Sequence, residues 1–419
     1  MKGNKKILVV GSGGRCHAIV DALSKSRQVG KIYCAPGNAG IAEQAECVGI
    51  GVEDIESLAD FAEKEGIDLT IPGPEASLCK GIADEFLKRG LKVFGPSKKA
   101  ARIESSKEFA KEIMAAGNVP TASYRSFDNY AEAAAYVREH GVPTVIKFDG
   151  LAAGKGVVVA TTMEEADEAL KSMFEDEKFG KGRVIIEEFL EGPEFSFMCL
   201  VNGEKVYPLA IAQDHKRAFD GDKGPNTGGM GAYSPVGFIT PEIEKEALEK
   251  IMKPVAKTLK ATGNEFLGIL YGGLILTKEG PKVIEFNARF GDPETEVVLP
   301  RLESDFIELI EAVMEGKDFE PKWKEDTLLG IVLCADGYPE SYKKGIELDI
   351  PKDENILIYH MGTKTEDGKT LSSGGRILMA IGKGKTVEQA SKKALETIEK
   401  IAPEGTFYRK DIGKRYGHS

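Results

Sequence analysis

VIEFNARFGDPE, residues 283–294, is the stretch around which the rest of this chain is organised. Successive side chains of a β-strand point to opposite faces, so Ile284 and Phe286 are predicted to enter a core while Glu285, Asn287 and Arg289 share the other face. A carboxylate and an amide oxygen followed by a guanidinium suit a hard cation that carries phosphate. The pattern also fits the solvated face of an ordinary strand, so the interpretation depends on a partner stretch.

KFDGLAAGKG, residues 147–156, is that partner. Lys147 ends an apolar strand, where partial burial makes an anionic partner favourable, and Lys155 adds a second charge. Glycine lacks a Cβ, so this loop can fold closely over a ligand. A plain hairpin is the alternative, but the two lysines favour phosphate. The loop is not a P-loop, because Gly-x-x-x-x-Gly-Lys-Ser/Thr is absent. We predict a metal on the first stretch and a polyphosphate on the second.

The composition of the 419 residues is that of an ordinary globular protein, with 42% hydrophobic and 29% charged residues. A net charge of -11 argues against a general nucleic-acid surface. The six cysteines show no Cys-x-x-Cys pair, which indicates a reducing compartment and no zinc site. No apolar run approaches the roughly 20 residues of a membrane span. We therefore expect a cytoplasmic protein with no nucleic-acid or membrane partner.

The first hundred residues predict a parallel sheet with crossover helices. Short apolar runs alternate with amphipathic stretches, and a turn containing glycine or proline follows each run. Ligands of such sheets bind at the carboxyl ends of strands, which makes Asn38, Pro74 and Glu75 candidates for lining a sugar. The runs are residues 6–10, 31–35, 46–50, 68–72 and 91–94.

GSGGRCH, residues 11–17, follows the first strand and opens a helix, a place where backbone N–H groups bind phosphate. An NAD site is disfavoured, because Cys16 takes the third glycine position of G-x-G-x-x-G and the second strand ends without a ribose-binding acid. Gly13, Gly14 and Arg15 fit a terminal monophosphate. A tight turn needed only for packing is the alternative.

The middle of the chain predicts a helix from Ser97 to about Gly117, which carries Lys107. A compact α+β block follows, and its last strand has acids at its end. That strand fits the wall of a purine pocket, where Glu187 or a backbone carbonyl accepts the adenine amino group and Glu194 takes ribose hydroxyls, or a simple charged strand exit. The strands of the block are predicted at 144–148, 157–160 and 183–190.

A long polar, glycine-rich segment, residues 213–231, follows a hairpin predicted through Asn202-Gly203. A loop of this length in a compact domain is usually functional or disordered. Its basic triplet favours substrate contact, and a solvated flexible loop is the alternative. Further helices are predicted at about 241–262 and 294–316.

A smaller αβ unit beyond residue 327 is predicted to cover one side of the site, with strands near 328–335, 356–361 and 376–383 and a helix from about 387 to 401. The predicted domains are an N-terminal αβ substrate-phosphate domain at 1–103, a nucleotide-binding domain at 104–326 with a lid at about 119–190, and a C-terminal αβ domain at 327–419.

Three long motifs resemble the ATP-grasp superfamily and, within it, the phosphoribosylamine–glycine ligase family. They are DHKR at 214–217, GPNTGGMGAYSP at 224–235 and EFNARFGDPE at 285–294. With the GSGGR loop and the YRKDIG tail at 408–413, the resemblance spans nearly the whole chain. It implies a multidomain α/β and α+β fold: an N-terminal parallel-sheet domain, an ATP-grasp domain with a mobile lid, and a small C-terminal αβ domain.

The resemblance also implies a reaction in which ATP, glycine and 5-phosphoribosylamine give glycinamide ribonucleotide, ADP and phosphate through glycyl phosphate. Glu285 and Asn287 would hold Mg²⁺ or Mn²⁺, and the catalytic residues would be Arg289, Lys216 and Asp214, the last facing the ammonium of glycine. The expected ATP contacts are Lys107, Lys147, Gly154, Lys155, Gly156, Glu187, Leu190 and Glu194. The expected substrate contacts are Gly13, Gly14, Arg15, Asn38, Pro74, Glu75, Asn226, Thr227, Gly228 and Gly229.

Two alternatives remain open. Another ATP-grasp ligase or a ribonucleotide carboxylase would share the chemistry of 147–156 and 285–289 without needing 214–217 or 224–231. A nucleotide-binding sensor that has lost turnover would keep the pocket alone, although the full set of lysines with Glu285 and Asn287 favours an enzyme. We expect a monomer with ATP as co-substrate.

Overall fold

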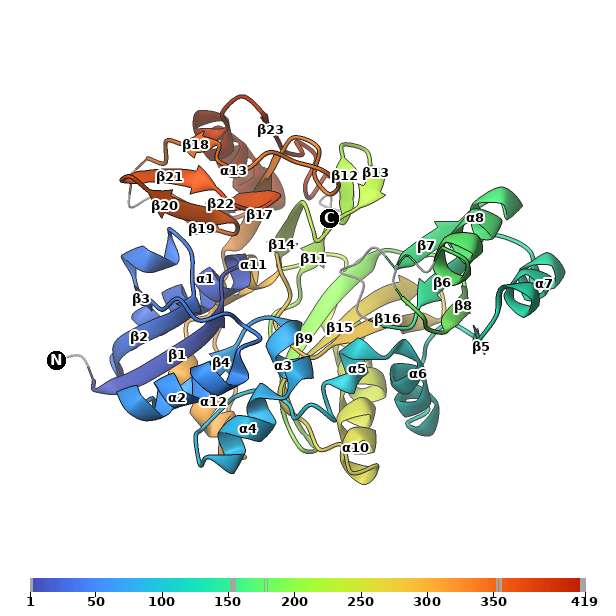
Figure 1. Ribbon diagram of the computed structural model, residues 1–419, viewed down its shortest axis with the longest axis horizontal. Coiled ribbons are helices and arrows are strands. Elements are labelled where there is room, and N and C mark those ends of the chain that lie inside the picture. Colours follow the sequence, from blue (N-terminus) through green and yellow to red (C-terminus); the bar gives the residue numbers. More distant parts are fainter. Residues whose placement is uncertain are drawn as a thin grey trace.

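The computed structural model describes residues 3–150, 156–176, 178, 180–351, 353 and 356–414. Figure 1 shows three lobes around a central region: the N-terminal sheet in blue, a green lobe from the middle of the chain, and the C-terminal sheet in red. No helix within these described ranges is long and apolar enough to cross a membrane. The multidomain α/β architecture predicted from the sequence is confirmed.

The N-terminal sheet is parallel, as predicted, with strand order β3-β2-β1-β4. Residues 7–10 are fully buried, which explains their uninterrupted apolar run. The expected strand at 91–94 contributes only an isolated bridge from Val93 to Thr70. The strands are β1 (Lys5–Gly11), β2 (Val29–Pro36), β3 (Glu46–Cys47) and β4 (Leu69–Pro72), and the helices are α1 (Gly14–Ser24), η1 (Ile41–Glu43), α2 (Ile55–Glu65), α3 (Glu75–Lys80) and α4 (Ile82–Lys88).

A four-stranded antiparallel sheet of order β10-β9-β15-β16 forms the centre of the molecule. Strand β15 pairs with β9 along nine residues and with β16 on its other side, so the VIEFN segment lies at the edge of this sheet. The strands are β9 (Glu194–Asn202), β10 (Lys205–Pro208), β15 (Leu267–Thr277) and β16 (Gly280–Asn287).

The 119–190 block is a separate layer with its own hydrophobic core. Its antiparallel sheet has the order β5-β8-β6-β7, and two helices pack together on it. Figure 1 shows it projecting from the side of the central sheet. The elements are β5 (Tyr124–Phe127), α7 (Tyr130–His140), β6 (Thr144–Phe148), β7 (Val157–Ala160), α8 (Met163–Phe174) and β8 (Val184–Glu188).

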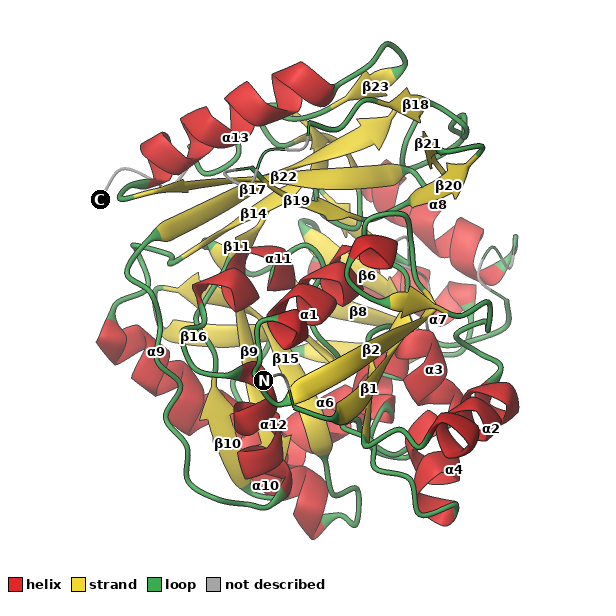
Figure 2. Cartoon of the chain, turned by 90° about the vertical axis from the view of Figure 1, so that its left-hand side faces the viewer, coloured by secondary structure: helices red, strands yellow, loops and turns green. Residues whose placement is uncertain are grey.

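The C-terminal sheet includes strands from the preceding motif segment. Its order is β11-β14-β17-β22-β19, with β23 also paired to β17. Because β14 pairs with β17, the sheet extends across residue 327 of the chain. Figure 2 shows α1 between this sheet and the N-terminal sheet. The elements are β11 (Gln213–Asp214), β14 (Gly231–Ser234), β17 (Thr327–Ala335), β19 (Leu357–His360), β22 (Arg376–Gly384), α13 (Val387–Ile401) and β23 (Thr406–Phe407), with the small pairings β12 (Arg217–Phe219) to β13 (Lys223–Asn226) and β18 (Glu347–Leu348), β21 (Lys369–Ser372) and β20 (Thr363–Glu366).

Three predicted helices are interrupted. Ser106 is extended and its side chain accepts a hydrogen bond from the N–H of Phe109, so it ends one helix and caps the next. Asp305 caps α12, since its side chain accepts hydrogen bonds from the N–H groups of Ile307 and Glu308. Pro254 has no N–H to donate, which accounts for the π-turn before α10. The segments are α5 (Arg102–Ser105) and α6 (Lys107–Ala116); α9 (Pro241–Ala247), η2 (Leu248–Met252) and α10 (Lys253–Ala261); and α11 (Thr295–Val298), η3 (Leu299–Arg301) and α12 (Phe306–Met314).

Candidate active site

Strand β16 positions the two residues predicted to hold a metal. Glu285 and Asn287 alternate with buried Phe286, and the Glu285 side chain is 38% exposed. Burial alone would raise the pKa of Glu285, but three nearby lysines lower it, which keeps the carboxylate charged. No closed cluster of three metal-ligating side chains occurs in the described part of the chain. The carboxylate of Glu285 and the amide oxygen of Asn287 are ligands of the kind that a hard divalent cation takes, with phosphate and water oxygens completing its coordination.

Two of the lysines predicted to meet phosphate, Lys147 and Lys107, lie beside this strand. The Lys147 ammonium donates to the carbonyl oxygen of Ile284 at 3.0 Å, directly before Glu285. The Lys107 ammonium donates to the Gly150 carbonyl at 3.0 Å. Burial lowers the pKa of Lys107, while Glu285 acts in the opposite direction. Lys147 of one stretch thus meets strand β16 of the other, and Lys107 of α6 lies near the same Glu285 carboxylate.

A third lysine, Lys111, was not singled out from the sequence. It lies one turn after Lys107 on α6, so the i, i+4 spacing was an available signal. Its ammonium lies 3.2 Å from Oε1 of Glu187, and the Lys147 ammonium lies 2.8 Å from Oε2 of the same carboxylate. The Glu187 carbonyl accepts a hydrogen bond from Thr144 Oγ1 at 2.9 Å. Both carboxylate oxygens of Glu187 thus face lysines, and its predicted contact with the adenine amino group stays a prediction.

The other predicted nucleotide contacts surround this cluster. Leu190 follows β8 and is half-buried, and Glu194 begins β9, where its carboxylate lies 3.3 Å from the ammonium of Lys216. Gly156 is buried, and its carbonyl accepts a hydrogen bond from the Phe148 N–H at 2.8 Å. Gly154 and Lys155 lie outside the described residues.

Asp214 is the last residue of β11 and Lys216 follows two residues later, and both reach the same site. The Asp214 Oδ1 atom is buried without a hydrogen-bond partner. Burial and the neighbouring Glu294 carboxylate raise the pKa of Asp214 well above its ordinary value. The Lys216 ammonium lies 4.0 Å from the Glu285 carboxylate. The Glu194 carboxylate, and to a smaller extent that of Glu285, raises the pKa of Lys216 well above its ordinary value. An unpaired buried carboxyl beside the metal strand is suited to receiving a cationic group.

The loop of Asn226, Thr227, Gly228 and Gly229 closes over Asp214. A Cβ on Gly229 would lie 2.7 Å from Asp214 Oδ1, and its φ of +115° also favours glycine. The loop is held from the C-terminal sheet by Arg376, which donates to the Gly228 carbonyl at 2.7 Å and lies 2.8 Å from Asp292 Oδ1. Sequence reasoning missed Arg376, because nothing near it in the chain indicates a partner almost 150 residues away.

The GSGGR loop packs on the GDPE segment. The Arg15 guanidinium donates to the Phe290 carbonyl at 2.9 Å and lies 3.4 Å from Asp292 Oδ2. A Cβ on Gly13 would lie 3.2 Å from Asp292 Oδ2, and one on Gly14 would lie 2.2 Å from Glu296 Oε1. A side chain at Gly14 would therefore collide with Glu296, one at Gly13 would need Asp292 to shift slightly, and carboxylates of this chain already face the start of α1.

Arg15 and Arg289 both lie near the carboxylate of Glu75. Glu75, the first residue of α3 after its N-cap Pro74, lies 3.7 Å from Arg15 and 3.4 Å from Arg289. Arg289 lies 3.2 Å from buried Glu104 and donates to Asn287 Oδ1 at 3.3 Å. Arg289 lies beyond the end of β16, so an ion-pair network orients it rather than the strand pleat.

Asn38 is buried, and the protein uses all of its hydrogen-bonding positions. Its amide nitrogen donates to the carbonyls of Ser12 and His360, at 2.7 and 2.9 Å. Its amide oxygen accepts from the N–H groups of Gly40 and Ile41. With its two donor and two acceptor positions filled, the Asn38 side chain fastens the strand-end loops, and its predicted substrate contact stays a prediction.

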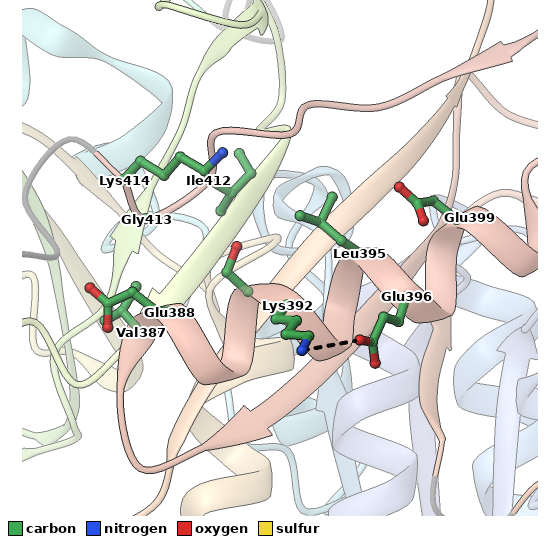
Figure 3. A pocket seen from close by; sticks show the side chains of 10 residues that line it. Val387, Glu388, Lys392, Leu395, Glu396, Glu399, Ile412, Gly413 and Lys414 are labelled. Carbon is green, nitrogen blue, oxygen red and sulfur yellow. Dashed lines mark ion pairs between the residues drawn. The ribbon is translucent and has the colours of Figure 1, made fainter.

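A surface pocket lies away from these residues, between α13 and the segment 412–414 (Figure 3). It is lined by the apolar side chains of Val387, Leu395 and Ile412 with exposed charges around them. It contains none of the predicted nucleotide or substrate residues. The candidate active site is therefore the place where the motif residues converge, and this pocket lies outside it.

Three models of one family match the chain in order. Residues 5–104 match the N domain of phosphoribosylglycinamide synthetase, residues 105–295 its ATP-grasp (A) domain, and residues 328–415 its C domain. The phosphoribosylamine–glycine ligase of Listeria innocua is 54% identical over 416 residues, covering 98% of this chain and 99% of that protein. The ligase of Halalkalibacterium halodurans is 51% identical, covering 98% and 96%.

Solved structures agree with these matches. The crystal structure of the phosphoribosylamine–glycine ligase of Thermotoga maritima superposes with a TM-score of 0.86 at 35% identity, covering 97% of this chain and 100% of that one. A biotin carboxylase–β,γ-ATP complex from Campylobacter jejuni gives a TM-score of 0.75 at 18% identity, covering 97% and 93%. At 18% identity, the likeness to the biotin carboxylase shows a shared fold alone.

Proposed function

The chain belongs to the phosphoribosylglycinamide synthetase family, and from this we propose how its own residues carry out the ligation. The reaction joins glycine to 5-phosphoribosylamine with ATP, gives glycinamide ribonucleotide, ADP and phosphate, and belongs to purine biosynthesis. The observation that carries the site assignment is the 3.0 Å contact between the Lys147 ammonium and the Ile284 carbonyl. It joins the lysine stretch to the acid–amide strand.

A carboxylate is a poor acyl donor to an amine, because its charge repels the nucleophile and oxide is a poor leaving group. Transfer of the γ-phosphoryl group from ATP to the glycine carboxylate gives glycyl phosphate. The nitrogen of phosphoribosylamine then attacks the carbonyl, an amide bond forms, and phosphate leaves. Catalysis of both steps consists mostly of positioning and charge neutralisation.

Lys107, Lys147 and Lys155, with Gly154 and Gly156, contact the ATP phosphates in this proposal. Glu285 and Asn287 would hold Mg²⁺ or Mn²⁺, which supplies charge neutralisation at the triphosphate when bound. Leu190 and Glu194 form the wall of the nucleoside pocket. Glu187 lies at the base of that wall and orients the phosphate-binding lysines.

The residues proposed for acyl transfer come from separate segments of the chain. Asp214, with a buried and unpaired oxygen, receives the glycine ammonium. Lys216 lies between Glu194 and Glu285 and faces the reacting carboxylate. Arg289 steadies the transferring phosphoryl group. The loop Asn226, Thr227, Gly228 and Gly229 encloses the acyl phosphate, which hydrolyses if water enters.

The 5-phosphate of phosphoribosylamine is proposed to lie at Gly13, Gly14 and Arg15, with Pro74 and Glu75 beside the sugar. The start of α1 and the Arg15 guanidinium support this, and the phosphate would have to share Arg15 with Asp292. We also propose that the chain divides into domains at residues 1–103, 104–326 and 327–419. The separate core of the 119–190 block supports its closure as a lid. We further propose a cytoplasmic monomer.

The test is phosphate release by the purified chain with each substrate omitted in turn. The expected result is release that requires ATP, glycine and phosphoribosylamine together. Release with another amino acid in place of glycine, or with bicarbonate, would favour a different ATP-grasp ligase or a carboxylase. ATP binding without phosphate release would indicate a nucleotide-binding sensor. A crystal structure with a non-hydrolysable ATP analogue and Mg²⁺ would test each contact.

A further inference from the structure

Lys111 is a buried lysine to which the mechanism above gives no part. Its side chain is 2% exposed. Its ammonium donates to Thr121 Oγ1 at 3.0 Å and to the Ala122 carbonyl at 3.2 Å, and lies 3.2 Å from Glu187 Oε1. Lysine is almost never fully buried unless it is paired. Burial lowers the pKa of Lys111, and Glu187 opposes that effect.

Glu187 connects this lysine to the nucleotide site. Each of its two carboxylate oxygens faces one ammonium, Oε1 that of Lys111 and Oε2 that of Lys147. The Lys147 ammonium uses a second N–H on the Ile284 carbonyl, so one of its three N–H groups remains for a phosphate oxygen. The three buried side chains carry one net positive charge.

We propose that Lys111 is a positioning residue that balances the charge of Glu187, so that the charge of Lys147 stays available to the ATP phosphates. The inference rests on the proposed function, in which Lys147 contacts those phosphates. Without Lys111, Glu187 and Lys147 would form a neutral pair, and the attraction of the site for a triphosphate would fall. The Glu187 side chain orients Lys147 by accepting from its ammonium, and the amide oxygen of a glutamine can accept in the same way.

A purely structural role for Lys111 is the competing explanation. Lys111 and Thr121 also tie α6 to β16, because Thr121 Oγ1 donates to the Val283 carbonyl at 2.8 Å. Loss of that tie would lower stability, and removing the Glu187 charge would not restore nucleotide binding. Charge balance makes the opposite prediction, since Glu187→Gln in the Lys111→Met background returns the net charge to +1. The double variant therefore separates the two explanations.

The experiment measures the dissociation constant of MgATP by titration calorimetry on the full chain, with kcat and KM for each substrate. Lys111→Met is expected to weaken MgATP on the order of tenfold, since buried charges a few ångströms apart interact strongly. Lys111→Met with Glu187→Gln is expected to return to within about threefold of wild type, and Lys111→Arg to stay near wild type. The KM values for glycine and phosphoribosylamine should change little.

Arg301→Met is the matched control. Arg301 is another buried cation of the same body, with hydrogen bonds to Ser234 Oγ and to the Asp326 and Lys324 carbonyls. It should lower stability and leave MgATP affinity unchanged. Glu187→Gln alone keeps both lysines and is measured in case Lys111→Met does not fold. Its MgATP affinity is expected to equal or exceed that of wild type.

Two results would overturn the inference. A double variant that binds no better than Lys111→Met would show a structural tie only, and weaker binding in Glu187→Gln would show a direct contact with the nucleotide. Lys147→Met distinguishes this failure from failure of the proposed function. If Lys147→Met binds MgATP normally, the ATP site itself is misassigned. If Lys147→Met loses binding while Lys111→Met does not, only the charge-balance inference fails.

Discussion

Glu296→Gln should stabilise this protein, and increasingly so as the pH rises. Glu296 is 0% exposed in α11, and neither of its carboxylate oxygens has a hydrogen-bond partner in the structure. Burial and the neighbouring Asp292 raise its pKa well above the ordinary value, against the opposing effect of Arg376 and Arg15. Glutamine fills the same space and also leaves polar atoms without partners, so the comparison isolates the charge.

The sign and size follow from proton linkage. Below the ordinary glutamate pKa, both folded and unfolded chains hold the proton and Glu296 has no pH-dependent effect. As the pH rises, the unfolded chain ionises first, and wild-type stability is lost until the raised pKa of the folded state is reached. The loss is at most about 1.4 kcal/mol per pH unit, so we expect Glu296→Gln to gain about 1–3 kcal/mol between about pH 5.5 and about pH 7.5.

The assay is urea denaturation of wild type and variant at these two pH values, followed by circular dichroism. Glu303→Gln serves as the control, because Glu303 is exposed and lies in the same part of the chain. It should show the pH dependence of wild type. Equal stability of Glu296→Gln and wild type at both pH values, or a less stable variant at the higher pH, would refute the reasoning and indicate a partner for the Glu296 carboxylate.

Three further predictions concern catalysis and the lid. Glu285→Ala should lower ligation on the order of a hundredfold or more while near-ultraviolet circular dichroism stays unchanged, because its half-exposed side chain contributes little packing; normal phosphate release at limiting Mg²⁺ would show that the metal is held elsewhere. Arg15→Ala should raise KM for phosphoribosylamine about tenfold and leave KM for ATP within about twofold. Equal changes in both KM values would indicate that the 5-phosphate binds elsewhere. Ile146→Ala removes a fully buried side chain from the lid core and should cost about 2–4 kcal/mol there. Hydrogen exchange should rise within residues 124–188 only, and a rise across the central sheet would mean that the lid does not unfold by itself.

Much of the fold was predictable, because the relevant signals lie between neighbouring residues. Apolar runs such as 7–10 specify buried parallel strands, and the helix at 387–401 has the predicted bounds, with Thr386 capping its first turn. The alternation at Glu285, Phe286 and Asn287 likewise sets which side chains leave the core. The interrupted helices were missed because Ser106 and Asp305 are compatible with a helix interior as well as with a cap.

The candidate site likewise combines features that the sequence determines with contacts that only the folded structure creates. The sequence alone determined which residue types carry the chemistry: lysines with glycines on one stretch, and an acid and an amide two residues apart on another. Only the tertiary structure decided which charges meet. Arg376 reaches Gly228 and Asp292 from a distant strand, Glu187 is shared by Lys111 and Lys147, and Arg15 is paired with Asp292. The physical reason is range: strand alternation and helix capping act over a few residues, whereas an ion pair depends on distances that exist only once the separate sheets have packed together.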